Sequence, residues 1–476
     1  MIQLATADVF IVCMYFLAVL YIGYRAVRKT SSDSTDFLLA GRSLTLPVFV
    51  MTLVSTWYGG ILGVGEFSYR YGISSWIVQG VPYYLFAGIF AIVLAKRIRA
   101  TNHSSIPDQL HAVFDRRTAL LGSALTFILM TPAPYILMLS VFLEILFGWS
   151  MAMSLVVTAI VAVSYLYWGG LRADVETDKF EFILMFLGFA VIIPFCVLKY
   201  GGWNFLSTQL PPLHLTWHGG NSWQFIAVWF FIALWTLVDP AFHQRCYAAK
   251  DGKVAKRGIL ISIVFWLFFD AMTATAGLYS RAVLPNLESP LMAYPMLAEA
   301  VLPPVAKGLF YVGMLATIMS TLNTLAFVSA QTLGRDIVLR WRMGELTGDN
   351  RLSDLTTTYT RAGLLVSFAL AVVLAVAVPS VIELWYTIGT VVVPGLLLPL
   401  MASYFERLRV SANYAFVIMI VGWMVSSVWL LTGYLGGSMG VYPWGIEPMY
   451  PGLLASLVVW IVGRISYRFP FDISTS

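Results

Sequence analysis

Long apolar segments alternate with short polar gaps along the whole of this chain. Each segment holds about 20 residues, the length that an α-helix needs to cross a hydrocarbon core of about 30 Å. The pattern therefore predicts an all-α integral membrane protein with about 13 transmembrane helices and a single domain over residues 1–476. The segments lie near residues 8–24, 46–69, 74–95, 118–147, 151–168, 180–198, 222–244, 258–280, 305–334, 362–379, 381–404, 413–435 and 446–463.

The basic residues fix an expected orientation. Of the 29 Lys and Arg residues, 25 fall in every second gap between the apolar segments. Cytoplasmic loops of membrane proteins carry this excess, and Asp and Glu count for little. An odd number of helices then predicts an N-terminus outside and a C-terminus in the cytoplasm. The short loops favour the plasma membrane, or inner membrane, of a bacterium. The net charge of +5 becomes a signal of orientation and not of nucleic-acid binding.

Composition narrows the class of protein further. The chain is 59% hydrophobic and 11% charged, and its mean hydropathy is +0.81. A soluble domain carries about 25% charged residues. The sequence contains no P-loop, no nucleophile elbow and no paired catalytic carboxylates, so nothing in it favours an enzyme or an ATP-driven pump. Membrane lipid is an expected partner, and no obligate protein partner is evident.

A glycine pair interrupts the second apolar segment at Trp57-Tyr58-Gly59-Gly60, directly after Ser55 and Thr56. Small and polar residues in mid-membrane favour a broken helix, whose freed carbonyls need a neighbour, water or an ion. The alternative is a contact between small residues that lets two helices approach closely. The segment alone leaves these two interpretations open.

The ninth segment carries a stripe of hydroxyl side chains. Thr317, Ser320, Thr321 and Thr324 recur at i, i+3, i+4 and i+7, which places them on one face of a helix. Neutral oxygens that converge on one point suit a small alkali cation, as hard cations prefer oxygen ligands. The alternative is that each hydroxyl bonds a carbonyl of its own helix.

Acidic residues inside the membrane are costly and mark candidate functional positions. Asp178 enters the sixth segment, where it is either an acid favoured by the helix dipole or a carboxylate that shares a cation site. Asp239 precedes a proline that bends or breaks the seventh segment, and it is expected to pair with Arg245 or a nearby lysine as a cytoplasmic gate. Glu66 and Asp270 are further candidates without an assigned role.

Several motifs in order make the chain similar to the sodium:solute symporter family over nearly its whole length. The resemblance implies the LeuT-type fold, with a 5+5 inverted-repeat core over about 46–200 and 222–404, one extra N-terminal helix and two extra C-terminal helices. It also implies a sodium-coupled importer of a small organic solute that works by alternating access. The motifs are 36-DFLLAGRSL-44, 55-STWYGG-60, 69-YRYG-72, 168-WGGL-171 with 177-TD-178, 244-QR-245 with 248-AAK-250, and 319-MSTLN-323 with 334-GRD-336.

The resemblance also implies site residues. The main sodium (Na⁺) site corresponds to the carbonyls of Leu53, Thr56 and Thr317 and the hydroxyls of Ser320 and Thr321. A second sodium site, present in some members, corresponds to Asp178 with Thr317 and Ser320. Substrate or gate positions correspond to Ser55, Trp57, Tyr58, Gly59, Gln79, Trp235 and Asp239.

The chain departs from two substrate classes of that family. It lacks the acidic and amide pair of the sugar carriers near Trp57, and its fourth segment holds no arginine to bind the carboxylate of a sialic acid. The substrate therefore stays open. Two rivals to sodium symport are a proton-coupled transporter with Asp178 as the proton carrier and a sensor of the same fold that binds solute without moving it.

Overall fold

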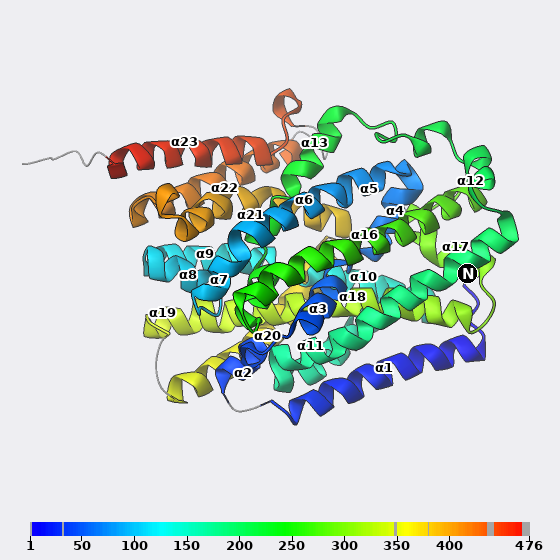
Figure 1. Cartoon of the computed structure of the whole chain (residues 1–476), viewed down its shortest axis with the longest axis horizontal. Helices are drawn as coiled ribbons and strands as arrows, with labels where there is room; N and C mark the ends of the chain where they lie inside the picture. The colour runs from blue at the N-terminus through cyan, green and yellow to red at the C-terminus, as the bar shows by residue number, and fades with distance from the viewer. Residues whose placement is uncertain (1, 31–32, 347–349, 379, 436–441, 469–476) are drawn as a thin grey trace, which may run out of the picture.

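The computed structural model describes residues 2–30, 33–346, 350–378, 380–435 and 442–468. Within these ranges every regular element is helical, apart from one isolated bridge between Leu44 and Ala249. Most helices run along the longest axis of the molecule, so that they form one bundle (Figure 1). The predicted all-α fold is confirmed.

The helices follow the predicted apolar segments closely. The first half of the chain forms α1 (Thr6–Val27), α2 (Ser34–Leu39), α3 (Leu46–Trp57), α4 (Ile61–Tyr71), α5 (Ser74–Gln79), α6 (Val81–Ile89), α7 (Ala95–Ala100), α8 (Ile106–Val113), α9 (Arg116–Leu129), α10 (Ala133–Phe147), α11 (Met151–Tyr200) and α12 (Trp203–Gln209). The second half forms α13 (Trp223–Ile232), α14 (Trp235–Val238), α15 (Pro240–Ala248), α16 (Gly252–Val283), α17 (Ala293–Val301), α18 (Ala306–Gln331), α19 (Arg340–Met343), α20 (Asn350–Ala377), α21 (Val381–Tyr404), α22 (Ala412–Leu435) and α23 (Met449–Arg468).

Among the described residues, 11 helical stretches are long and apolar enough to cross a membrane, and a twelfth is added if the bent pair α3 and α4 is counted. The sequence predicts about 13. The difference of one arises at α11, because its 50 residues contain Gly170 with φ +53° and ψ −145°, which is not helical.

The chain reverses at Gly170. Tyr165 on one arm of α11 bonds Asn323, and Asp174 on the other arm accepts a hydrogen bond of 2.7 Å from Thr324. A straight helix would place residues 165 and 174 roughly 13 Å apart along its axis, yet both reach consecutive residues of α18. The arms 151–169 and 171–200 therefore lie side by side, as the two separate segments of the sequence predict.

Two helices of the bundle are interrupted halfway. The axis bends by 60° between α3 and α4, where a turn over 58–60 replaces the helix. The second interrupted helix is α13–α15, which breaks after Ile232 and again at Asp239, where the backbone is extended (φ −66°, ψ 115°). The proline after Asp239 lacks an N–H and cannot continue the α14 ladder, which explains the second break. Each of the two repeats that the family resemblance implies, at about 46–200 and 222–404, thus begins with a broken helix.

Close glycine contacts bring α11 against the centre of the bundle. A Cβ atom built on Gly188 would lie 2.7 Å from the Cα of Gly313 on α18, so only glycine allows the two backbones to approach this far. All but two of the 26 residues of α18 are buried, Ala306 and Leu309 being the exceptions. Helix α18 is therefore the central element, and its hydroxyl stripe faces protein and not lipid.

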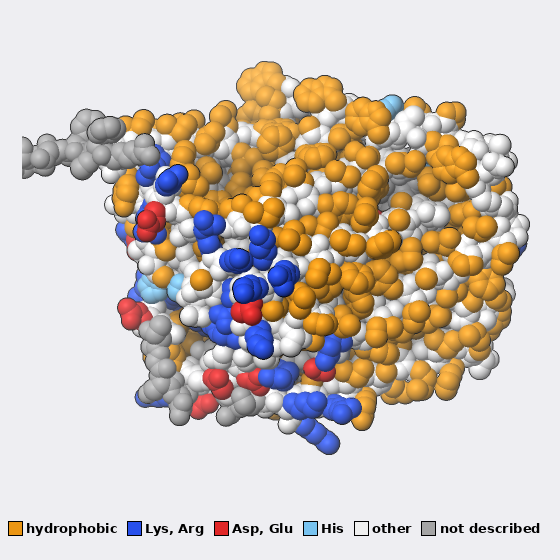
Figure 2. All heavy atoms as spheres, in the orientation of Figure 1, with side chains coloured by type: hydrophobic (Ala, Val, Ile, Leu, Met, Phe, Trp, Pro, Cys, Tyr) orange, Lys and Arg blue, Asp and Glu red, His pale blue; other side chains and the backbone are white. Residues whose placement is uncertain are grey.

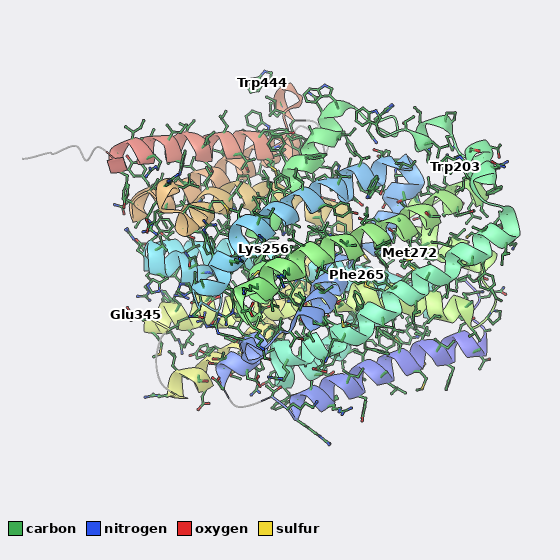
Figure 3. The ribbon with its side chains drawn as sticks, in the orientation of Figure 1. Trp203, Lys256, Phe265, Met272, Glu345 and Trp444 are labelled. Atoms are coloured by element: carbon green, nitrogen blue, oxygen red, sulfur yellow. The ribbon has the colours of Figure 1, made fainter. Side chains whose placement is uncertain are left out.

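Charge separates the two ends of the bundle. Helix α1 begins at the right end of the view in Figure 1 and α23 ends at the left. Lys and Arg side chains gather toward that left end, and most of the remaining visible face is apolar (Figure 2). Along α16, Lys256 lies near the charged end, and Phe265 and Met272 follow toward the other end (Figure 3). The apolar face is that of a multi-pass membrane protein.

Candidate functional site

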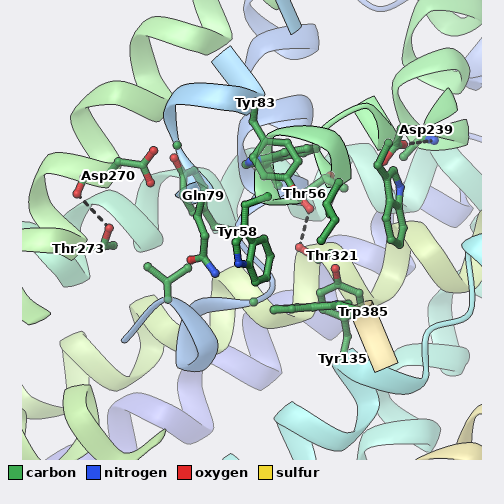
Figure 4. Close-up of a pocket in the computed structure, with 18 of the residues that line it drawn as sticks. Thr56, Tyr58, Gln79, Tyr83, Tyr135, Asp239, Asp270, Thr273, Thr321 and Trp385 are labelled. Atoms are coloured by element: carbon green, nitrogen blue, oxygen red, sulfur yellow. Dashed lines mark hydrogen bonds between the residues drawn. The ribbon is translucent and has the colours of Figure 1, made fainter. Parts of the chain in front are cut away.

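A cavity of about 170 Å³ lies where the two broken helices meet. Its wall combines residues of α3, α4, α5 and α6, of α10, of the broken helix α13–α15, and of α16, α18 and α21. Figure 4 shows Thr56, Tyr58, Gln79 and Thr321 near its middle, with Asp270 toward one side and Asp239 toward the other. Ligand sites of transporters with inverted repeats lie at such a position.

Most predicted site residues line this cavity. They are Leu53, Thr56, Trp57, Tyr58, Gln79, Trp235, Asp239 and Thr321. Ser55 does not line it, because its side chain is fully buried and its hydroxyl donates to the Thr52 carbonyl of its own helix at 3.3 Å. Gly59 does not line it either, since it packs beneath Thr321 and Tyr135.

The glycine pair turns out to serve both interpretations that the sequence leaves open. The helix is broken at 58–60, and the missing side chains also make room for neighbours. A Cβ atom on Gly59 would lie 2.6 Å from Cε1 of Tyr135, and one on Gly60 would lie 2.8 Å from Cζ2 of Trp385. The break and the close approach therefore depend on the same two positions.

Hydroxyls of α18 meet α3 at the predicted main sodium site. Thr321 Oγ1 donates to the Thr56 carbonyl at 2.6 Å and lies 3.2 Å from the Thr317 carbonyl. Ser320 is on the same face and donates to Asp178 Oδ1 at 2.5 Å. A hydroxyl can rotate its proton away and offer a lone pair to a cation, so these oxygens fit a sodium ligand set. Leu53 lies about one turn earlier on α3 and lines the same cavity.

The hydroxyl stripe makes contacts between helices at three of its four members. Ser320, Thr321 and Thr324 bond Asp178, Thr56 and Asp174 respectively. Thr317 instead donates to the Met314 carbonyl of its own helix at 2.7 Å, as the alternative interpretation predicts for a single hydroxyl. Thr317 and Asp178 therefore share no bond in this structure.

Asp178 does contact a cation, and that cation is the side chain of Arg245. Arg245 on α15 is fully buried, and its Nη2 lies 3.1 Å from Asp174 Oδ2 and 3.4 Å from Asp178 Oδ2. The same nitrogen lies 2.6 Å from the hydroxyl of Thr324. Asp178 also accepts a hydrogen bond from Thr52. The interpretation of Asp178 as a dipole-favoured helix end is wrong, because its carboxylate faces the interior of the bundle.

The expected gate pair between Asp239 and Arg245 does not form in the described structure. Asp239 Oδ1 accepts from the backbone N–H groups of Ala241 at 2.7 Å and Phe242 at 3.1 Å, which makes it the N-cap of α15. Arg245 lies on a different face of α15 from Asp239, so it contacts Asp174 and Asp178 instead. Asp239 remains part of the cavity wall.

The sequence interpretation missed Asp174 and Glu181. With Asp178 they recur at i, i+4 and i+7, so they form an acidic stripe on the second arm of α11. All three are buried. Asp174 and Asp178 face the hydroxyl stripe of α18, and Glu181 accepts a hydrogen bond of 2.9 Å from Tyr15 on α1. The spacing was a usable signal in the sequence.

The cavity adjoins a second hollow on one side and the buried helix α15 on the other. Trp229 and Tyr386 line both the cavity and a second hollow between α4, the start of α21 and the α22–α23 connection. Toward Arg245, all nine residues of α15 are buried and close the cavity. A bundle with two broken helices around a central cavity is the architecture of a membrane transporter.

Comparisons with known proteins agree with this class. Residues 37–422 match the model of the sodium:solute symporter family. The sodium/pantothenate symporter of Escherichia coli is 28% identical over 473 residues, covering 94% of each chain. The osmoregulated proline transporter OpuE of Bacillus subtilis is 26% identical and covers 96% of this chain and 95% of its own.

Solved structures show the same fold. A Na⁺-coupled sialic acid symporter in a substrate-bound, outward-open state superposes with a TM-score of 0.78 at 16% identity, covering 98% of each chain. A nucleobase-cation-symport-1 family transporter in a closed conformation superposes with a TM-score of 0.59 at 14% identity, covering 92% of this chain and 96% of its own.

The chain belongs to the sodium:solute symporter family. It is a multi-pass membrane transporter and not an enzyme, it couples a small-molecule solute to sodium, and its helices have the LeuT-type arrangement. Sodium as the coupling ion replaces the proton-coupled and sensor alternatives.

Proposed function

We propose that this symporter imports its solute with one sodium ion, which binds between α3 and α18. The carbonyls of Leu53, Thr56 and Thr317 and the hydroxyls of Ser320 and Thr321 are the proposed ligands. The observation that carries this proposal is the bond of 2.6 Å between Thr321 Oγ1 and the Thr56 carbonyl, at the wall of the cavity. It brings two oxygen atoms from elements 265 residues apart in the sequence to one point.

Arg245 supports a single sodium. Its guanidinium already lies beside the carboxylate that a second sodium would require, at 3.4 Å from Asp178 Oδ2 and 3.1 Å from Asp174 Oδ2. A second cation beside it would be repelled by a like charge in a buried site. A stoichiometry of one sodium per solute follows, and the second site expected at Asp178, Thr317 and Ser320 is not part of the proposal.

Inward transport follows from the proposed orientation. The end of the bundle that gathers Lys and Arg is the cytoplasmic side, so the N-terminus lies outside and the C-terminus inside. The hollow at Trp229 and Tyr386 then opens to the outside, where sodium is more concentrated. Cysteines introduced at Glu288 and at Glu345 test this. An impermeant maleimide added to intact cells should label the cysteine at 288 and not the one at 345.

The sodium site is tested by thermal unfolding of purified protein in sodium and in potassium, with a panel of small solutes that includes pantothenate and proline. Sodium should raise the unfolding temperature, one solute should raise it further only in sodium, and Ser320→Ala/Thr321→Ala should remove both effects. The matched control is Ser140→Ala/Thr158→Ala, a buried hydroxyl pair 3.4 Å apart on α10 and α11. Equal stabilisation by sodium in both double variants would refute the site.

A further inference from the structure

Among the described residues, the cavity wall has acidic side chains but no basic ones. In the part of the chain that the structure describes, the residues that line the cavity include the carboxylates Asp239 and Asp270 but no Lys, Arg or His. A solute that presents a free carboxylate to this wall meets no cation of the protein. A solute that presents a cation meets anionic oxygens.

Gln79 adds an acceptor that needs a donor. Its Oε1 is buried and has no hydrogen-bond partner among the described residues, although Gln79 lines the cavity. Such an orphaned oxygen costs about 1–3 kcal/mol unless a ligand or water donates to it. An N–H group of a bound solute is one donor that would satisfy it.

Asp270 lies against Gly80, the residue after this acceptor. A Cβ atom built on Gly80, the residue after Gln79, would lie 2.9 Å from Asp270 Oδ2. Tyr84 donates a hydrogen bond to that oxygen and accepts one of 3.1 Å from Trp76 Nε1. The carboxylate is therefore held in place beside Gly80, one residue from Gln79, and Figure 4 shows Gln79 between Asp270 and Tyr58.

Aromatic rings form much of the remaining wall. Trp57 and Tyr83 meet edge to face with centroids 5.0 Å apart, and Trp76, Trp235 and Trp385 also line the cavity. The faces of such rings attract ammonium groups, and aromatic cages are the usual means of binding quaternary ammonium ligands. The aromatic rings, the Asp270 carboxylate and the unpaired Gln79 oxygen all favour a positively charged group on the solute.

We infer that the solute carries an ammonium group, which binds between Asp270, Gln79 and the aromatic wall. This inference rests on the proposed function and narrows its substrate class to organic cations and zwitterions. In a zwitterion the carboxylate would lie at the Thr56 and Thr321 side, next to the proposed sodium and in front of the buried Arg245, whose Nη2 is 3.2 Å from Thr56 Oγ1. An amine-free acid such as pantothenate would leave the Asp270 side without a counter-charge.

The test uses matched probes that differ in the amine alone. Thermal unfolding of the purified full chain in sodium is followed with L-proline against cyclopentanecarboxylate, choline against 3,3-dimethylbutanol, and pantothenate as an amine-free acid. We expect at least one ammonium probe to raise the unfolding temperature and its partner to have no effect. Asp270→Asn should weaken that probe by at least about tenfold, as expected for the loss of a charge-assisted contact. Gln79→Leu should weaken it less.

Controls separate this inference from the proposed function. Stabilisation by sodium alone should survive in Asp270→Asn, and Glu288→Gln, which removes an exposed carboxylate, should leave both effects unchanged. A sodium effect that persists while no ammonium probe binds, or while pantothenate binds equally well to wild type and Asp270→Asn, would overturn the inference and leave the symport proposal standing. Loss of the sodium effect in wild type would refute the proposed function itself.

Discussion

Replacing Arg245 by glutamine should strongly destabilise the protein, because two buried carboxylates would lose their cation. Arg245, Asp174 and Asp178 all have 0% exposure, and the two ion-pair distances are 3.1 and 3.4 Å. Removing one partner of a buried pair costs about 3–5 kcal/mol, since the remaining charge stays uncompensated in a medium of low dielectric constant. Here two carboxylates remain, so we expect the upper part of that range.

The assay is unfolding of the detergent-solubilised protein by SDS, followed by tryptophan fluorescence in potassium. Arg245→Gln/Asp178→Asn should recover at least about 1 kcal/mol relative to Arg245→Gln, as interacting residues have coupling energies of about 0.5–3 kcal/mol. Arg117→Gln is the matched control, because its ion pair with Asp115 is on the surface, with side chains 68% and 28% exposed. It should change stability by less than about 1 kcal/mol.

Sodium gives a second and independent readout. Without the guanidinium, Asp178 and Ser320 offer an anionic oxygen site, and sodium should stabilise Arg245→Gln more than it stabilises wild type. The sodium dependence of stabilisation should also become steeper if a second ion binds. An Arg245→Gln variant within about 1 kcal/mol of wild type in potassium, with an unchanged response to sodium, would refute the reasoning.

Three further predictions follow from the site and its surroundings. Thr321→Ser should keep most of the sodium-dependent rise in unfolding temperature while Thr321→Ala loses it, because the hydroxyl and not the methyl group contacts the Thr56 carbonyl; equal loss in both variants would contradict this. Gly59→Ala should cost about 1–3 kcal/mol in SDS unfolding and reduce solute uptake, because its Cβ would collide with Tyr135 and overpack the break; wild-type uptake would contradict this. Burial acts to raise the pKa of Asp108, but Arg335 and Arg340 at 3.0 and 2.5 Å hold it well below its usual value. Its stabilising effect is thus complete above the unfolded pKa of about 4 and lost as the pH falls below it, so unfolding temperatures measured from pH 6 to 3 should fall less in Asp108→Asn than in wild type.

The fold could be predicted well because the bilayer imposes a simple length rule on every helix. The segments near 151–168 and 180–198 are separate in the sequence pattern, and the reversal at Gly170 places them side by side. The break at Gly59-Gly60 was one of two interpretations that the sequence left open, the other being a close helix contact, and the structure shows both. The additional break after Ile232 carries no such signal, because the residues around it are apolar and aromatic.

The partners in the site were less predictable for a physical reason. Arg245 lies 67 and 71 residues from the two carboxylates that it contacts, and nothing local in the sequence relates them. Asp239 is closer to Arg245 in sequence, but its carboxylate accepts hydrogen bonds from backbone N–H groups at the start of α15 instead. Local N–H donors at a helix N-terminus compete successfully with a side-chain ion pair, since they need no further ordering of side chains. Only the packing of α3, α11, α15 and α18 decides where the guanidinium lies.

The same packing suggests how solute and sodium become coupled. Thr56 and Thr321 both line the cavity and bond each other, so a cation held there would form part of the surface that the solute contacts. Thr56 Oγ1 also contacts Arg245, which belongs to the fully buried helix α15. A cation at Thr56 would therefore contact the solute at the cavity wall. It would also affect the position of α15 through Arg245. Because coupling is reciprocal, a solute that improves sodium binding must be bound better in the presence of sodium by the same factor.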